Sequence, residues 1–442
     1  MTIATQYRLR GRTAADIASS AERAIAEGRL PAGAVLPPVR SLAADLGVSP
    51  GTVAAAYRAL AARGLVRGEG RRGTRVRPAP PLATPGGLAL PPGVVDLADG
   101  NPDPALLPPL APALARAGRR QRLYGEPAAG AELVERVVAG LAADGVPADR
   151  VAVVGGALDG LERVLQAATR PGDAVAVEDP GYPGVHDLVA ALGLAAVPVA
   201  VDDAGPLPDD LDRALAGGAA VAVVTPRAGN PTGAAVDAER RRDLRRVLRR
   251  HPDALVVEDD HAGPVAGADL LPLADGRRPR WAVLRSVSKS LGPDLRLAVV
   301  AGDATTVARV EGRQRLGAGW VSHVLQDTVA ALLADPATEA RLERAASTYA
   351  GRRAALVAAL ARHGIAATGR SGLNVWVPVP AEEPVVAGLL ARGWAVAAGA
   401  RFRLRSGPAV RVTVARLRRA DALRLAADLA ATVAPAAVTR LA

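Results

Sequence analysis

The sequence contains no cysteine, which excludes disulfide bonds and thiolate chemistry. A metal site would have to use the five histidines and the carboxylates, and we expect no metal. Long apolar runs are also missing, since no stretch approaches the roughly 18 residues of a membrane-spanning helix. No apolar segment follows Arg8, Arg10 and Arg12, so the first residues do not resemble a secretory signal. We therefore expect a soluble, cytoplasmic protein.

Lysine is nearly absent as well. Of the 55 Lys and Arg residues, 54 are Arg, and the single lysine is Lys289. Arginine supplies positive charge as well as lysine does, but it cannot form a Schiff base and effectively never loses its proton. Lys289 is therefore either a chance survivor on the surface or a residue required for its amine. Aromatic residues are also scarce, at 2% of the chain, so an aromatic residue near a candidate site is informative.

Positive charge is concentrated in the first part of the chain. The net charge is +11, and residues 1–77 hold thirteen arginines against five acidic residues. The remaining residues hold 42 basic and 39 acidic groups, which nearly balance. A basic segment attached to a nearly neutral body is typical of a nucleic-acid-binding domain, although a solvated basic arm has the same composition.

The length of the chain allows two or three domains. Residues 78–93 read PAPPLATPGGLALPPG, with nine Pro or Gly in sixteen residues, and this composition favours a linker over a helix or a central strand. We therefore predict a first domain over residues 1–77, a Pro/Gly-rich linker over 78–95 and a second domain over 96–442.

The second domain alternates short apolar runs with longer helical patterns. This rhythm predicts βαβ units and a mostly parallel sheet that is buried on both faces, so the fold class is α/β. Beyond about residue 335, helical patterns and two short strands, around 375–377 and 410–414, predict a smaller α+β lobe. The runs that predict strands of the large sheet are residues 151–154, 174–177, 219–224, 254–257, 281–284 and 298–301.

The first domain has the pattern of a helix-turn-helix. Residues 13–27 predict an amphipathic helix that ends at Gly28. Two further helices are separated at Gly47, and the second of them starts with Ser49 as N-cap and Pro50 at its first position. Helix, tight turn and helix is the geometry that places a second helix in the major groove. A Gly/Arg-rich hairpin follows and suits a wing that lies on DNA phosphates.

Residues 6–77 resemble the winged helix-turn-helix of GntR-type regulators. The hallmark is Leu-Pro-x-x-Arg, then Leu-Ala, Val-Ser-x-x-Thr-Val and an Ala-Tyr pair. One position departs, because Pro50 stands where the family often has arginine. The matching residues are Leu36, Pro37, Arg40, Leu42, Ala43, Val48, Ser49, Thr52, Val53, Ala56 and Tyr57. The residues that the resemblance places on DNA are Arg40, Ser49, Thr52, Arg71 and Arg72.

The region 150–300 offers each group that pyridoxal phosphate needs from a protein. Lys289 follows the predicted strand 281–284, at the edge where open α/β sheets bind ligands, and offers an amine for the aldehyde. Asp259 ends another buried strand and offers an anion for the pyridine nitrogen. The other groups are a phosphate cradle at residues 155–158 with Arg296, a stacking ring at Tyr182 and an amide donor at Asn230.

Residues 96–442 resemble the fold-type I aminotransferases. The resemblance rests on the order of six motifs, which are Gly-Gly-Ala, Pro-x-Tyr, Asn-Pro-Thr-Gly, Asp, Ser-x-Ser-Lys and Arg. The resemblance implies that Lys289 holds pyridoxal 5'-phosphate as an aldimine. It also implies that Arg411 grips a substrate carboxylate, although a surface charge on a strand has the same pattern. His261 replaces a tyrosine that usually bonds the phenolate. The remaining residues that the resemblance assigns to the cofactor are Asp259, Asn230, Tyr182, Gly156, Ala157, Ser286 and Arg296.

A GntR-type winged helix joined to a fold-type I domain is the arrangement of MocR/GabR-type transcriptional regulators. The resemblance implies a homodimer, a double-stranded DNA operator with paired half-sites, and an amino-acid-like or vitamin-B6-related effector that acts at the Lys289 aldimine. Two alternatives stay open. In one, the chain is a working aminotransferase with Lys289 as its base and an accessory DNA-binding domain. In the other, the second domain is a scaffold that no longer holds the cofactor.

Overall fold

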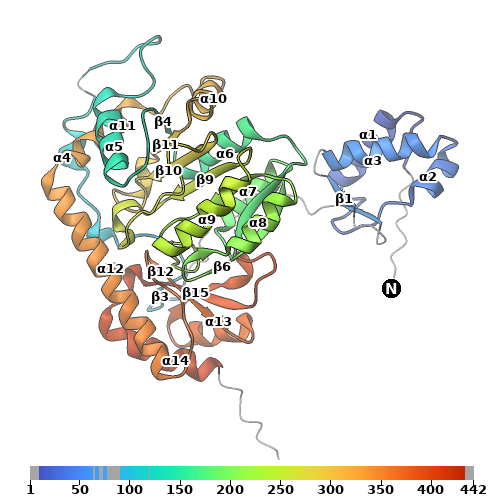
Figure 1. Cartoon of the computed structure of the whole chain (residues 1–442). Helices are drawn as coiled ribbons and strands as arrows, with labels where there is room; N and C mark the ends of the chain where they lie inside the picture. The colour runs from blue at the N-terminus through green and yellow to red at the C-terminus, as the bar shows by residue number, and fades with distance from the viewer. Residues whose placement is uncertain (1–8, 63–64, 69–72, 77–89, 119, 434–442) are drawn as a thin grey trace, which may run out of the picture. The chain divides into compact units, whose positions relative to one another are not determined.

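The computed structural model describes residues 9–62, 65–68, 73–76, 90–118 and 120–433. The chain divides into two compact units: the first holds the residues before Gly87 together with Thr169–Val175 and His186–Ala196, and the second holds the remaining residues (Figure 1). Most of the predicted linker lies outside the described residues, so the domain boundaries stay a prediction.

The first unit contains the three helices and the hairpin that the sequence predicts. Thr13 and Asp16 form a reciprocal capping box at the start of the first helix. Gly47 ends the second helix in the left-handed conformation, with φ of 64°. Ser49 caps the third helix by accepting the backbone N–H of Thr52 at 3.1 Å, which confirms the predicted cap. The elements are α1 (Ala14–Ala26), α2 (Val39–Leu46), α3 (Pro50–Ala62), β1 (Val66–Gly68) and β2 (Thr74–Val76).

The second unit is built on an eight-stranded sheet with the order β4-β11-β10-β9-β8-β5-β6-β7. Strands β8, β9 and β10 are parallel neighbours, and β11 runs antiparallel to both β10 and β4. All six predicted strands are present, with β6 and the short β7 in addition. The strands are β4 (Val151–Val154), β5 (Ala174–Asp179), β6 (Ala195–Asp202), β7 (Gly205–Pro206), β8 (Ala219–Val224), β9 (Leu255–Asp260), β10 (Trp281–Ser286) and β11 (Ala298–Gly302).

Helices cover this sheet. α6 packs on α10 and against β4, β10 and β11, while α8 lies against β8 and α9 (Figure 1). The helices of the region are α4 (Ala111–Leu114), α5 (Ala131–Ala143), α6 (Ala157–Ala168), α7 (Pro183–Ala191), α8 (Pro208–Ala216), α9 (Ala238–Arg250), α10 (Ala304–Arg315), α11 (His323–Leu333) and the long α12 (Pro336–Arg362). None of the helices in the described residues is both long and apolar enough to cross a membrane.

The smaller lobe holds an antiparallel sheet, β12-β15-β14, packed with α12, α13 and α14. Its core includes Leu97, which lies directly after the predicted linker. The same segment forms β3, which pairs in parallel with β13, so the start of the second domain belongs to its C-terminal lobe. The lobe's elements are β3 (Val95–Asp96), β12 (Asn374–Pro378), α13 (Glu382–Ala391), β13 (Trp394–Ala395), β14 (Ala397–Ala398), β15 (Ala409–Thr413) and α14 (Ala422–Val433).

Candidate cofactor and effector site

Lys289 lies three residues beyond the end of β10, at the carboxyl edge of the parallel strands. Its Nζ donates to the backbone carbonyl of Gly100 at 2.9 Å. Burial lowers the pKa of the Lys289 amine, and the nearby Arg411 guanidinium lowers it further. A lysine with a depressed pKa offers more of the neutral amine, which is the form that attacks carbonyl carbons.

Asp259 stands on β9, where it is paired in register with Leu284 of β10. The side chain is buried, and within the described structure its Oδ1 has no hydrogen-bond partner. Burial, with the negative charge of Asp260 beside it, raises the pKa of Asp259 to about 7. A buried carboxylate with an open oxygen requires a donor or a cation, and a protonated ring nitrogen supplies both.

Asp260 has the opposite environment. Arg227 makes a bidentate pair with it at 2.8 and 2.9 Å, and Arg285 adds a bond at 2.8 Å. Burial opposes its ionisation, but the hydrogen bonds from Arg227 and the charges of both guanidinium groups lower the pKa of Asp260. This pair was not predicted from the sequence, because Arg227 lies 33 residues away along the chain.

Arg411 occupies β15 and is 5% exposed, so it is not a surface charge on a strand. Its Nη1 donates to Asn230 Oδ1 at 3.0 Å, and its Nη2 donates to the carbonyl of Ala98. Phe402 lies under the guanidinium, 4.7 Å from ring centroid to Cζ. Burial lowers the pKa of Arg411 to about 10. Nε has no partner among the residues described, which leaves a donor for an anion.

Asn230 is oriented by its neighbours. Its Oδ1 accepts from Arg411 and, at 3.4 Å, from the Nδ2 of Asn374. The amide Nδ2 of Asn230 is therefore the end that is turned toward other acceptors. Arg411 in turn bonds Ala98, and Lys289 bonds Gly100, so Asn230 is linked through Arg411 to the backbone segment that Lys289 contacts.

Gly100 is a site residue that the sequence analysis missed. Its φ is 71°, and a Cβ on it would lie 3.3 Å from Nη2 of Arg411. Glycine at this position therefore permits both the turn and the close approach of the guanidinium. The only local signal is the Asp99-Gly100-Asn101-Pro102 turn, and its contact with Lys289 spans 189 residues.

The residues predicted to form a phosphate cradle lie together at the start of α6. Gly156 has φ of 115°, and a Cβ there would lie 2.9 Å from Nη2 of Arg296. Arg296 also donates to the carbonyl of Gly155 at 3.1 Å. Ala157 is the first residue of α6, and Arg296 bonds Gly155 two residues before it. The helix N-terminus and the Arg296 guanidinium, both of which favour anions, therefore lie close together. The N–H of Gly155 is taken by Asp159 at 2.8 Å, which the sequence analysis did not foresee.

Ser286, His261 and Tyr182 complete the set of predicted cofactor residues. Ser286 ends β10 and bonds Ser288 between hydroxyl oxygens at 3.1 Å. Burial lowers the pKa of His261 to about 4, and the charge of Lys289 contributes, so the imidazole is neutral at physiological pH. Tyr182 stands just before α7, is 40% exposed and lies close enough to Arg411 to influence its pKa.

The predicted DNA contacts lie in the first unit. Arg40 is exposed on α2. Ser49 and Thr52 stand at the N-terminal end of α3, where their hydroxyl groups bond each other at 2.9 Å. Tyr57 is structural, because its hydroxyl donates to the carbonyl of Pro37 at 2.7 Å and ties α3 to the residues before α2. Arg71 and Arg72 lie outside the described residues.

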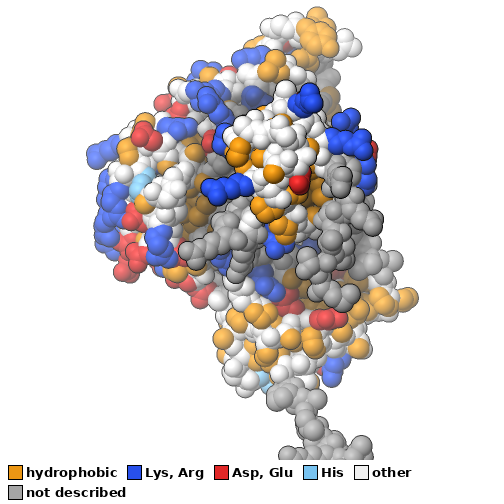
Figure 2. All heavy atoms as spheres, turned by 90° about the vertical axis from the view of Figure 1, so that its right-hand side faces the viewer, with side chains coloured by type: hydrophobic (Ala, Val, Ile, Leu, Met, Phe, Trp, Pro, Cys, Tyr) orange, Lys and Arg blue, Asp and Glu red, His pale blue; other side chains and the backbone are white. Residues whose placement is uncertain are grey.

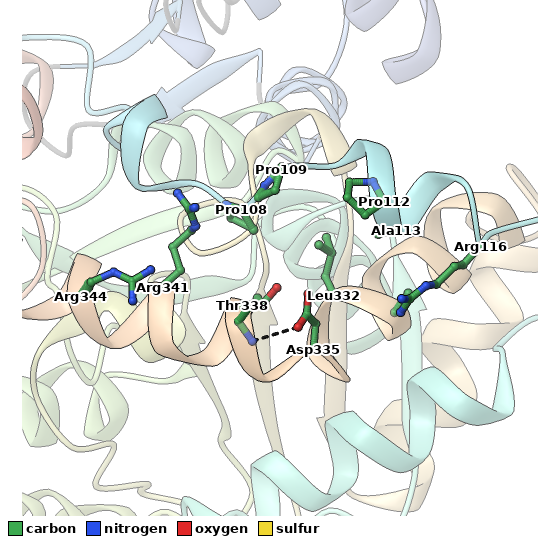
Figure 3. Close-up of a pocket in the computed structure, with 12 residues that line it drawn as sticks. Pro108, Pro109, Pro112, Ala113, Arg116, Leu332, Asp335, Thr338, Arg341 and Arg344 are labelled. Carbon is green, nitrogen blue, oxygen red and sulfur yellow. Dashed lines mark hydrogen bonds between the residues drawn. The ribbon is translucent and has the colours of Figure 1, made fainter.

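A separate hollow of about 160 Å³ lies between α4 and the start of α12 (Figure 3). Prolines line one side, and Arg116, Arg341 and Arg344 border it. Arg341 also donates to the carbonyl of Ala105 at 3.3 Å. None of the predicted site residues lines this hollow, so it is distinct from the Lys289 site.

The fold of the second unit has solved counterparts. Residues 92–429 match the family described as aminotransferase class I and II. An archaeal alanine:glyoxylate aminotransferase superposes with a TM-score of 0.71 at 23% identity, covering 77% of this chain and 90% of that one. The α-aminoadipate aminotransferase LysN of Thermus thermophilus superposes with a TM-score of 0.69 at 25% identity, covering 77% and 92%. The second unit is therefore a fold-type I, aminotransferase-like domain.

Residues 13–76 match the gntR family of bacterial regulatory proteins. The vitamin B6 salvage pathway transcriptional repressor PtsJ of Salmonella typhimurium is 41% identical over 95% of this chain and 98% of its own length. The pyridoxine biosynthesis regulator PdxR of Corynebacterium glutamicum is 30% identical over 75% of each chain. The probable rhizopine catabolism regulatory protein MocR of Rhizobium meliloti is 27% identical over 77% of this chain and 75% of its own length. This chain belongs to the MocR-type transcriptional regulators, with a gntR winged helix ahead of an aminotransferase-like domain.

Proposed function

We propose that the chain is a cytoplasmic, pyridoxal-phosphate-dependent repressor or activator that senses a vitamin-B6-related or amino-acid-like effector at Lys289. The observation that carries the proposal is that Lys289 and Arg411 both bond one backbone segment, 98–100, while Arg411 also bonds Asn230, in a chain that has a DNA-binding domain. The names of PtsJ and PdxR, which refer to vitamin B6 and pyridoxine, support a B6-related effector.

The residues present fit pyridoxal phosphate. The open oxygen of Asp259 would take the ring nitrogen, and the amide of Asn230 would donate to the phenolic oxygen. Gly156, Ala157, Ser286 and Arg296 would hold the phosphate, where the absent Cβ of Gly156 leaves room beside Arg296. Tyr182 would cover the ring, and His261 would stand near the phenolic oxygen as a neutral donor. When bound, the cofactor supplies an electrophilic carbon that reacts reversibly with amines.

The chain's own residues then determine what is sensed. Lys289 anchors the cofactor through its amine, whose lowered pKa favours attack. Arg411 has an unpartnered Nε in a buried setting and would bind a carboxylate on an amine effector. Because Arg411 and Lys289 both contact residues 98–100, an effector that recruits either group would displace that segment. The segment continues into the linker, so differential binding at the site can bias the DNA-binding state.

Two copies of the chain are expected to act together. We propose a homodimer that binds an operator with paired half-sites, because a two-fold assembly presents two recognition helices to the DNA. In each copy, Arg40, Ser49 and Thr52 would contact the operator, and Arg71 and Arg72 would contact it from the wing.

The proposal is tested by titrating the full-length protein with pyridoxal phosphate and then with candidate amines. Absorbance of the lysine-bound cofactor and binding to the protein's own promoter region are measured on the same samples. We expect both signals to change over the same effector concentrations. Steady amine turnover without promoter binding would instead identify a working aminotransferase. No spectral change on adding pyridoxal phosphate would identify a scaffold without cofactor.

A further inference from the structure

Helix α9 concentrates positive charge on the aminotransferase-like domain. It carries seven arginines in thirteen residues, against the two acids Glu239 and Asp243. Its net charge of +5 exceeds the +3 of residues 78–442, so all other residues in that range together carry −2. α9 lies beside α8 on the side that faces the viewer in Figure 1. This side forms the left edge of Figure 2, where basic side chains lie interspersed with acidic ones.

Four of the seven arginines have partners within the fold. The buried stripe of α9 consists of Leu244, Val247 and Leu248, and the arginines stand on the remaining faces. The side chains of Arg241, Arg242 and Arg249 make no hydrogen bond or ion pair with any residue that the structure describes, and Arg242 and Arg249 are exposed. The four arginines with partners are Arg240 with Asp202, Arg245 with the carbonyls of residues 272–274, Arg246 with Asp243, and Arg250 with Asp212.

Helix stability does not explain the arginines on the remaining faces of α9. Arg241 and Arg245, Arg242 and Arg246, and Arg245 and Arg249 are like-charged neighbours four residues apart, an arrangement that weakens a helix. Arg241 and Arg242 also stand in the N-terminal half, where the helix dipole disfavours cations. Only the arginines of the last turn are placed favourably for the dipole. The exposed arginines of α9 therefore destabilise the isolated domain, and an anionic partner would offset this cost.

We propose that α9 is a second DNA-contacting surface, which binds backbone phosphates of duplex DNA independently of sequence. The partner is argued from charge complementarity and from the chain itself, whose gntR domain binds DNA and brings this polyanion to the protein. Guanidinium groups suit phosphate oxygens, and a helix of this length spans about 20 Å, enough to face several phosphates along one strand.

The test is the salt dependence of promoter binding by the full-length chain. In one variant, Arg241→Gln, Arg242→Gln and Arg249→Gln are combined, which removes only arginines without described partners. Each lost phosphate contact should reduce the slope of log K against log salt by about 0.9, so we expect a reduction of up to about 2.7. The affinities for promoter and unrelated DNA should fall by the same factor, because phosphate contacts carry no sequence information.

A control variant combines Arg116→Gln, Arg344→Gln and Arg362→Gln, three exposed arginines whose side chains also make no hydrogen bond or ion pair with the described residues. This control changes the net charge by the same amount as the α9 variant does. It should leave the slope of log K against log salt nearly equal to that of the unsubstituted chain. An α9 variant whose slope equals that of the control overturns the proposal, and this is the result expected if α9 instead binds an acidic protein. The single Arg242→Gln variant should reduce the slope of log K against log salt by about a third as much as the triple variant does. The fold-change caused by effector should persist in the α9 variant, so failure of effector sensing and failure of this surface are distinguishable.

Discussion

A carboxyl group buried without a cation favours its protonated form, and Asp259 is such a group in the absence of cofactor. Its folded pKa of about 7 lies above the ordinary value of 3.8. The folded state therefore holds this proton more tightly than the unfolded state does. The associated stability is present below about pH 4 and is lost as the pH rises through 7.

We therefore expect Asp259→Asn to stabilise the cofactor-free protein at about pH 8 and to have little effect at about pH 4. The gain should be on the order of a few kcal/mol, reduced by whatever relaxation the site allows. The measurement is the thermal unfolding midpoint across this pH range. The same variant should bind pyridoxal phosphate more weakly. A stability gain of equal size at both pH values would show that Asp259 is not protonated in the folded protein.

Arg411 gives a second prediction at the scale of a residue. Arg411→Lys keeps the positive charge but loses the planar pair of donors, so amines with a carboxylate should bind about 10- to 100-fold more weakly. Amines without a carboxylate should be affected little. Absorbance titrations with one compound of each kind provide the comparison. An equal loss for both kinds would mean that Arg411 holds the site together and does not select the effector.

The site residues also show what the sequence could reveal. Lys289 could be proposed as a site residue because arginine replaces lysine everywhere else, and Asp259 and Asn230 because each lies at or after the end of a recognisable strand. Gly100 and Arg227 were not identifiable, since their roles depend on partners 189 and 33 residues away that only the fold brings near.

At the scale of elements, α6 lies close to the sheet and carries the residues that we propose as a phosphate cradle. A Cβ on Gly160 would lie 2.9 Å from the Leu284 side chain and 3.1 Å from those of Val154 and Val300. Gly160→Ala should therefore push α6 away from the sheet, lower the free energy of unfolding by about 1–3 kcal/mol and weaken cofactor binding.

Gly140→Ala on α5 is the matched control, because a Cβ there meets nothing within 4 Å. It should be neutral or stabilising by about 0.5–1 kcal/mol, as expected when alanine replaces glycine inside a helix. Denaturant unfolding and cofactor titration of both variants provide the measurement. If both variants behave alike, close packing at Gly160 does not govern the cradle.

The elements were largely predictable where apolar periodicity is strong. The strands β4 and β8 begin and end where the sequence analysis places them. β6 was missed, and it carries Pro198, a residue that argues against a strand. β3 was missed because it has two residues and is held by β13, nearly 300 positions later, in a contact that no local pattern records.

At the scale of the whole molecule, we propose that a site on one unit controls DNA binding by the other. Domain order and fold were readable from composition, the linker and the two motif sets. The proposed coupling between the Lys289 site and DNA binding could not be predicted from the sequence. It depends on how residues 98–100 respond when Lys289 and Arg411 change partners.

The most direct measurement compares promoter binding by the unsubstituted chain and by Lys289→Arg, with and without pyridoxal phosphate and candidate amines. Arginine keeps a positive charge at this position but cannot bond the cofactor covalently. The account predicts that Lys289→Arg binds the promoter but that its affinity no longer responds to effector. A variant that keeps the full response would contradict the claim that the chain senses its effector through Lys289.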